Sequence, residues 1–145
     1  LFRIIPNTAI AVHEGMSFIT AHNATEAQTK VVVELFEPMG KTMVIPESLM
    51  TAATSLASCG MAYALRYLRA ASEGGVELGF TASAAHQIVA QTMVGAAQLI
   101  LQQDTHPEAE IDKVCTPGGW TIKGLNAMEE AGFTNAVIQG LLTNK

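Results

Sequence analysis

The stretch that decides the fold is Leu78–Gln103, LGFTASAAHQIVAQTMVGAAQLILQQ, which contains no Asp, Glu, Lys or Arg. Thr81 has the side chain of a helix N-cap, so we expect a long helix to begin there. Two series of small and apolar residues follow at helical spacing. Two stripes predict contacts on more than one side, and the small residues Gly95–Ala97 would let a neighbouring helix come close. The stripes are Ala85, Val89, Met93, Ala96 and Ile100, and Ile88, Gly95 and Leu99.

The same stretch does not predict a membrane-spanning helix. His86, Gln87, Gln91 and Gln98 interrupt it, whereas a spanning helix needs about 18 or more continuous apolar residues. The chain of 145 residues is 49% hydrophobic and only 14% charged, which is a low charge density for so short a chain. We therefore expect a soluble protein without a membrane partner, part of whose surface is covered by another copy of itself.

Composition also argues against several kinds of ligand. The net charge is -5 and the Lys and Arg residues form no cluster, so we expect no nucleic-acid partner. Cys59 and Cys115 lack the spacing of a metal site or a disulfide framework, which favours small buried cysteines or helix-end residues in a reducing, cytoplasmic compartment. No metal site is predicted, because the histidines share no helical face and no ligand spacing. These are His13, His22, His86 and His106.

Before Pro46 the sequence alternates between strand and helix signals. Three β-prone runs predict strands, and the spacing of Asn23 and Glu26 predicts a capping box at the start of a helix that stops at Gly40. This pattern is typical of the end of an α/β domain, so we assign residues 1–45 to the last part of such a domain. Because the chain starts within an apolar run, we expect it to continue a longer polypeptide. The expected strands are Phe2–Ile5, Met16–Thr20 and Thr42–Ile45, and the helix carries Ala27, Val31, Leu35 and Met39 on one face.

Beyond Pro46 the sequence predicts helices throughout, because capping residues and glycines alternate with apolar periodicity. We therefore assign residues 46–145 to a helical domain, which makes the chain mostly α. The expected caps are Ser48, Ser58, Thr81 and the capping-box pair Thr105 and Glu108, one helix is expected to end at Gly74-Gly75, and the last two are expected at about 117–130 and 135–142, separated by Gly132.

The segment 116–121, TPGGWT, is the most informative for function. It has the pattern of a helix N-terminus in which Thr116 caps, Pro117 takes the first position and two glycines remove side chains from the first turn. Exposed amides there, at the positive end of the helix dipole, would bind an anion such as a carboxylate. Thr121 lies close enough for its hydroxyl to touch the same ligand. The alternative is a helix start whose glycines only permit tight packing.

Longer segments around this one resemble the pyrroline-5-carboxylate reductases. The run Cys115–Glu129, CTPGGWTIKGLNAME, is similar to the signature of that family. Other segments resemble the family in the same order along nearly the whole chain. They are Ile5–Thr8, Glu14–Met16, Gly74–Gly79, Gln91–Ala97, His106-Pro107 and Gly132-Phe133.

The resemblance implies a Rossmann domain followed by a helical dimerisation domain, similar to the C-terminal bundle of 6-phosphogluconate dehydrogenase. Its implied activity is the reduction of 1-pyrroline-5-carboxylate to L-proline with NADP or NAD as cofactor, in a homodimer or a ring of dimers. The substrate carboxylate would lie on Thr116, Gly118, Gly119 and Trp120, with Thr121 as the catalytic residue at the imine nitrogen. Asp104 would approach that nitrogen across the dimer interface, and Pro6, Asn7 and Thr8 would line the nicotinamide end.

Two departures from the family pattern keep alternatives open. Residues 57–62, ASCGMA, stand where the family has Ser-Gly-Ser-Gly-Pro-Ala, and Trp120 is large where the family mostly has a small or β-branched residue. Both leave open a related reductase of another small imino or keto acid. The chain also has no Gly-x-Gly-x-x-Gly after a strand, so a phosphate cradle is missing. This leaves open a non-catalytic helical dimerisation module.

Overall fold

A computed structural model describes residues 1–143 of the chain. The chain forms two compact units, one made of Leu1–Ala64 together with the segment from Ile138 onward, the other made of Leu65–Val137. The division predicted between residues 45 and 46 rests on composition and motifs and stays a prediction.

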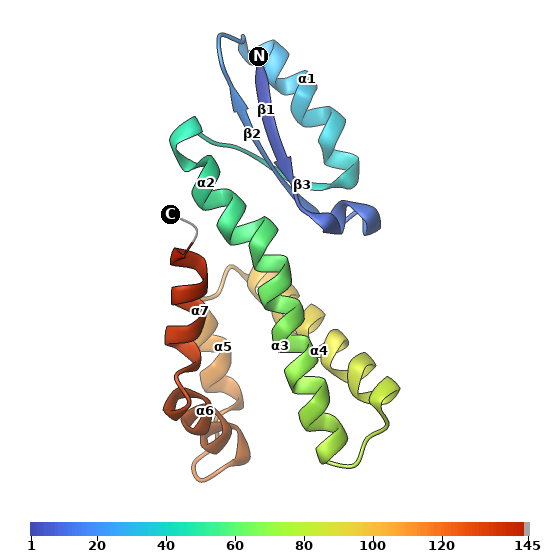
Figure 1. Cartoon of the computed structure of the whole chain (residues 1–145), viewed down its shortest axis with the longest axis vertical. Helices are drawn as coiled ribbons and strands as arrows, with labels where there is room; N and C mark the ends of the chain where they lie inside the picture. Colours follow the sequence, from blue (N-terminus) through green and yellow to red (C-terminus); the bar gives the residue numbers. More distant parts are fainter. Residues whose placement is uncertain (144–145) are drawn as a thin grey trace. The chain divides into compact units, whose positions relative to one another are not determined.

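The first unit contains a three-stranded mixed sheet, in which β1 (Phe2–Pro6), β2 (Gly15–Ala21) and β3 (Gly40–Val44) lie in the order β1-β2-β3 (Figure 1). β1 is antiparallel to β2, and β3 is parallel to β2. Neighbouring residues of a strand point to opposite faces, and both Phe18 and Ile19 of β2 are buried. The central strand is therefore covered on both faces. The three predicted strands are confirmed.

Helix α1 (Glu26–Phe36) follows β2, but its cap differs from the prediction. Thr25 is the N-cap and forms a capping box with Gln28, whereas Asn23 lies in the preceding turn with a φ of 49°. The helix ends at Phe36, and Pro38 lies in the short 3-10 helix η2 (Glu37–Met39) that follows. The predicted helix is confirmed, while its predicted capping box and its end at Gly40 are wrong.

A continuous helical segment follows β3. It starts with the 3-10 helix η3 (Glu47–Leu49) and proceeds through α2 (Met50–Ala53), the π-helix η4 (Thr54–Cys59) and α3 (Gly60–Glu77). Phe18, Met50 and Ala53 form the buried core between this segment and the sheet. The predicted caps Ser48 and Ser58 are wrong, because Pro46 precedes η3 and the helix passes through Ser58 without a break.

Helix α3 also continues through the glycine pair at which it was predicted to end. A glycine inside a helix costs only about 0.5–1 kcal/mol relative to alanine, so neighbours decide whether the helix continues. A Cβ on Gly75 would lie 3.0 Å from the Cβ of Ala85, and Ala85 is 1% exposed. Gly75 thus allows α3 and the next helix to approach closely within the second unit.

That next helix, α4 (Ala82–Gln103), begins as predicted, with the Thr81 hydroxyl accepting a hydrogen bond from the Ala84 amide at 3.3 Å. Its first apolar stripe is the more covered one, since Ala85 is buried and Val89 is half-buried. Its second stripe lies open, with Ile88 48% exposed. Among residues 1–143, no atom lies within 4 Å of a Cβ built on Gly95, so no helix of the described part makes the close approach predicted there. None of the helices within residues 1–143 is long and apolar enough to cross a membrane.

Three shorter helices complete the chain, namely α5 (Pro107–Val114), α6 (Trp120–Glu130) and α7 (Phe133–Leu142). His106 caps α5 through Nδ1, which accepts a hydrogen bond from the Glu108 amide at 3.2 Å, so the predicted cap Thr105 is wrong. The end of α7 belongs to the first unit. There Ser55 donates a hydrogen bond to the Leu141 carbonyl at 2.7 Å, and Tyr63 donates one to the Gly140 carbonyl at 3.0 Å.

Candidate functional site

The loop between α5 and α6 contains the predicted anion seat, but its helix begins later than predicted. The Gly119 amide donates a hydrogen bond to the Thr116 carbonyl at 2.9 Å, and Gly118 has a φ of 69°. Gly119 is the N-cap of α6, and Trp120 is its first residue. Thr116 is therefore part of a tight turn and does not cap the helix, because the left-handed residue Gly118 separates it from the first helical turn.

This shift changes which amides are available for an anion. The amides of the first three helical residues, Trp120, Thr121 and Ile122, have no acceptor within an α-helix, and no side chain caps α6. The first turn also carries no acidic residue. The positive end of the helix dipole is therefore not neutralised by a capping side chain or by an acidic residue of its own first turn. An anion would bind to the amides of Trp120–Ile122, with the glycines in front of them.

The two glycines have different roles. A Cβ on Gly119 would lie 2.3 Å from the Thr116 hydroxyl oxygen and 3.0 Å from the Thr116 carbonyl oxygen, so the turn itself requires a glycine there. No atom lies within 4 Å of a Cβ built on Gly118, although its positive φ favours glycine. Tight packing thus explains Gly119 but leaves the space beside Gly118 open.

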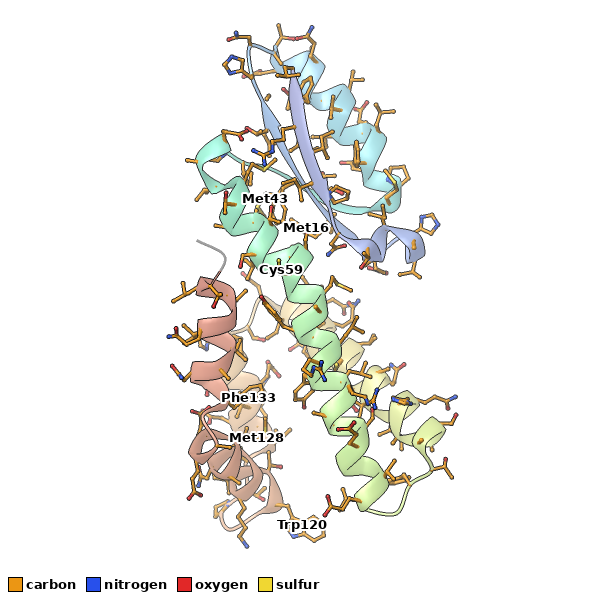
Figure 2. All side chains as sticks on the ribbon, viewed as in Figure 1. Met16, Met43, Cys59, Trp120, Met128 and Phe133 are labelled. Carbon is orange, nitrogen blue, oxygen red and sulfur yellow. The ribbon has the colours of Figure 1, made fainter. Side chains whose placement is uncertain are left out.

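The loop is accessible rather than enclosed. Thr116, Gly118 and Thr121 are exposed, and Trp120 is 92% exposed. Figure 2 shows the Trp120 side chain extending away from the ribbon at the start of α6. Hollows of about 640, 480 and 290 Å³ occur elsewhere in the two units and are lined by none of the loop residues. The loop therefore offers free amides to an anion but does not enclose a bound ligand.

Asp104, the predicted partner of the imine nitrogen, lies at the C-terminal end of α4. It is exposed and has a φ of 50°, in the left-handed region, which Asp tolerates better than most residues. Within residues 1–143, no hydrogen bond or ion pair joins Asp104 to the loop at 116–121. The fold of one chain does not link these two predicted site elements.

Among the described residues, the carboxyl group whose pKa is shifted is that of Glu110, on α5. Glu110 of α5 accepts a hydrogen bond from Lys113 at 2.6 Å. This bond holds the pKa of Glu110 below its ordinary value of 4.5. The shift comes from an ion pair within one helical turn. Glu110 therefore contributes to the stability of α5 and not to the candidate site.

The predicted cofactor-facing residues Pro6, Asn7 and Thr8 lie in the first unit, where β1 meets the 3-10 helix η1 (Thr8–Val12). The side-chain oxygen of Asn7 accepts hydrogen bonds from the Ala9 amide at 3.2 Å and the Met16 amide at 3.3 Å. Asn7 therefore holds the turn in place, and Thr8 is the exposed member of the three. The Ser58 hydroxyl also reaches the Pro6 carbonyl, at 3.5 Å.

Sequence reasoning missed this contact of Ser58. The sequence feature that could have indicated it is the segment 57–62, which departs from the family pattern. In the structure this segment spans the end of the π-helix η4. π-helical turns occur frequently at functional sites. Cys59 and Cys115 are both free and half-buried. In the part of the chain that the structure describes, no group of three or more His, Cys, Asp or Glu side chains is arranged to hold a metal ion.

A short three-stranded mixed sheet followed by a series of helices, with an exposed glycine loop between α5 and α6, defines the class of protein, namely a mostly helical fold that follows a short sheet. Residues 47–144 match the family model of pyrroline-5-carboxylate reductase dimerisation. The chain belongs to this family and corresponds to the C-terminal portion of the pyrroline-5-carboxylate reductases.

Similar proteins support the same assignment. Pyrroline-5-carboxylate reductases 1 and 2 of Dictyostelium discoideum are 41% and 40% identical over 99% and 98% of this chain, which spans 28% and 52% of their lengths. The chain is similar in structure to a reductase from Streptococcus pyogenes, with a TM-score of 0.94, 29% identity, and coverage of 99% of this chain and 56% of that one. A Plasmodium falciparum reductase with NADP bound gives a TM-score of 0.93 and 26% identity, with coverage of 99% and 59%.

Proposed function

We propose that this chain is the part of a pyrroline-5-carboxylate reductase that binds the substrate carboxylate and joins the subunits. The complete enzyme reduces 1-pyrroline-5-carboxylate to L-proline with NADPH or NADH. The observation that carries the proposal is the uncapped, open N-terminus of α6, directly behind a Thr-Pro-Gly-Gly-x-Thr loop in a chain of this family. A five-membered ring with one carboxylate is a ligand of suitable size and charge for this seat.

The seat does its chemistry mainly by positioning. The amides of Trp120–Ile122 hold the carboxylate, which fixes one end of the ring. Thr121, the second residue of α6, orients the ring by a hydrogen bond at the imine nitrogen. A threonine hydroxyl is a poor proton donor, so Thr121 acts by orientation, and a carboxylate near the nitrogen stabilises the protonated imine. We assign this carboxylate to Asp104 of a second copy, a residue that has no hydrogen bond or ion pair to the loop within residues 1–143 of its own chain.

A nicotinamide cofactor, when bound, supplies the hydride that the imine carbon accepts. Thr8 is exposed at the start of η1, and Asn7 fixes the turn that presents it, which suits Pro6, Asn7 and Thr8 to line one end of a dinucleotide. The chain contains no Gly-x-Gly-x-x-Gly, so these residues would not hold the phosphates. The Plasmodium falciparum relative, which carries NADP, supports a nicotinamide cofactor for this family.

The association surface is the open face of α4. Ile88 and Leu99, which share one stripe with Gly95, are 48% and 39% exposed on a helix that carries no Asp, Glu, Lys or Arg, and burial of such residues against a second copy is favourable. In the described part of the chain, no atom lies within 4 Å of a Cβ built on Gly95, so a helix of another subunit has room there. The family is named for dimerisation, which supports a homodimer or a ring of dimers.

The test is an assay of the complete polypeptide that contains this chain. With 1-pyrroline-5-carboxylate, we expect oxidation of NADPH or NADH and formation of proline. Turnover only with another imino or keto acid would replace this substrate by that of a related reductase. Absence of dinucleotide binding would instead leave a non-catalytic dimerisation module.

A further inference from the structure

Trp120 has a surface exposure that the chain itself does not explain. It is the only tryptophan among these 145 residues and is 92% exposed, the highest value among the exposed large apolar residues of the described part. An indole buries a large apolar area when it is covered. A fully exposed indole at the start of a regular helix is therefore available for a contact that lies outside its own fold.

Trp120 lies next to the anion seat, because it is the first residue of α6 and its own amide is one of the free amides. In an α-helix each Cα–Cβ bond tilts toward the N-terminus. No helical turn precedes Trp120, so its own helix does not cover the side chain on that side. Gly118 and Gly119, which come directly before it, have no side chains to occupy this space. Figure 2 shows the indole free of neighbouring ribbon.

We propose that Trp120 is a specificity-determining residue, whose indole closes over the ring of the bound imino acid. The inference rests on the proposed function, since it takes a small cyclic imino acid carboxylate as the ligand. The face of the indole is planar and carries partial negative charge, so it attracts a cation placed over it. The protonated imine is both planar and cationic. Trp120 therefore favours the charged form of a small flat ring and leaves less room for a larger one.

Kinetics of the complete enzyme test the role of the indole. The variants are Trp120→Ala, Trp120→Phe, which keeps an aromatic face, and Leu35→Ala, which removes an exposed apolar side chain of α1 (65% exposed) as a control. We expect Trp120→Ala to raise KM for 1-pyrroline-5-carboxylate by about 2- to 30-fold, the range of one cation–aromatic contact. Its kcat should change much less, and Trp120→Phe should restore part of the affinity.

Ring size gives a second readout that a purely structural role would not move. With the six-membered homologue, 1-piperideine-6-carboxylate, Trp120→Ala should gain relative to the five-membered substrate, so the ratio of the two kcat/KM values should shift toward the larger ring. An unchanged ratio, in an enzyme whose wild type reduces the five-membered imine normally, overturns this inference and leaves the proposed function intact. A wild type that reduces neither imine overturns the proposed function, and the inference with it.

Fluorescence shows what covers the indole. The emission of Trp120, taken as the difference between wild type and Trp120→Phe, should be that of a solvent-exposed indole in the free enzyme. It should shift to shorter wavelength or be quenched when the planar analogue pyrrole-2-carboxylate saturates the site. Emission typical of a buried indole before any ligand is added would show that a second subunit covers Trp120, and would overturn the inference. Unchanged emission while calorimetry records binding would do the same.

Discussion

Gly75 of α3 lies against Ala85 of α4 so closely that a methyl group on Gly75 would approach the Ala85 side chain to 3.0 Å. Its neighbour Gly74 occupies the same helix, and no atom lies within 4 Å of a Cβ built there. The two glycines therefore form a matched pair in which only one is required by packing.

We expect Gly74→Ala to stabilise the protein by about 0.5–1 kcal/mol, because alanine loses less backbone entropy in a helix. Gly75→Ala gains the same entropy but forces α3 away from the buried Ala85, so it should be destabilising, by about 1–3 kcal/mol as for other overpacked sites. Thermal or urea unfolding of both variants checks this. Equal stability of the two would contradict the close contact.

Gly119 offers a test of the turn that presents the α6 amides. A Cβ there would collide with Thr116, so Gly119→Ala should displace the turn and lower kcat/KM on the order of 100-fold, as a misplacement of about 1 Å can. The control is Gly124→Ala in the same helix, where a Cβ has open space. It should keep activity and gain a little stability. Full activity of Gly119→Ala would argue against a seat at this turn.

The side-chain oxygen of Asn7 accepts hydrogen bonds from two backbone amides, those of Ala9 and Met16. Asn7→Ala should cost about 1–3 kcal/mol of stability, the penalty for partly buried donors that lose their acceptor. Asn7→Asp keeps an acceptor oxygen and should be milder. Unfolding in urea measures both, and the affinity for NADPH measured alongside tests whether this turn faces the cofactor. Equal losses for the two variants would show that the acceptor oxygen is not what matters.

Self-association can be tested with two β-branched apolar residues of similar exposure on different helices. Ile88 on the open stripe of α4 is 48% exposed, and Val31 on α1 is 56% exposed. A glutamate buried in an apolar interface carries a large desolvation cost, so Ile88→Glu should dissociate the oligomer while Val31→Glu leaves it intact. Light scattering after size-exclusion chromatography measures the mass of the oligomer. An unchanged mass for Ile88→Glu would place the interface elsewhere.

The ion pair of α5 predicts a pH dependence with a definite sign. The hydrogen bond from Lys113 lowers the pKa of Glu110 in the folded state below 4.5, so Glu110 binds its proton more readily when unfolded. Its contribution to stability is therefore present above pH 4.5 and is lost as the pH falls through the lower, folded pKa. Lys113→Met should raise the pKa of Glu110, as followed by carboxyl NMR. A pKa unmoved by Lys113→Met would contradict the assignment, and because the pair is near the surface, high salt should weaken the effect.

Sequence reasoning located elements more reliably than their ends. All three strands and the long uncharged helix were predicted, because the alternation of apolar and polar residues in strands and the helical periodicity of apolar residues can be read from the sequence alone. Predicted caps shifted by one to three residues, from Asn23 to Thr25, from Thr105 to His106 and from Thr116 to Gly119. Each of these segments holds several polar or small residues that can end a helix, and local sequence does not rank them.

The candidate site shows the same division. The motif at 116–121 pointed to a helix N-terminus with bare amides, and the structure has one there. That Gly119 is required by its contact with Thr116 and that Trp120 is almost fully exposed could not be predicted from spacing. Both depend on which atoms the turn brings together. The roles of Asp104 and of Pro6, Asn7 and Thr8 stay predictions.

The sequence by itself determined the kinds of element, their order and the family to which the chain belongs, since these depend on side-chain chemistry and short-range periodicity. Only the tertiary structure decided that the helix from Met50 continues through Ser58 and past Gly75, and that one stripe of α4 is covered while the other stays open. The physical reason is that breaking a helix at a serine or a glycine changes the free energy by only about 1 kcal/mol. Contacts such as that between Gly75 and Ala85 are large enough to decide the outcome.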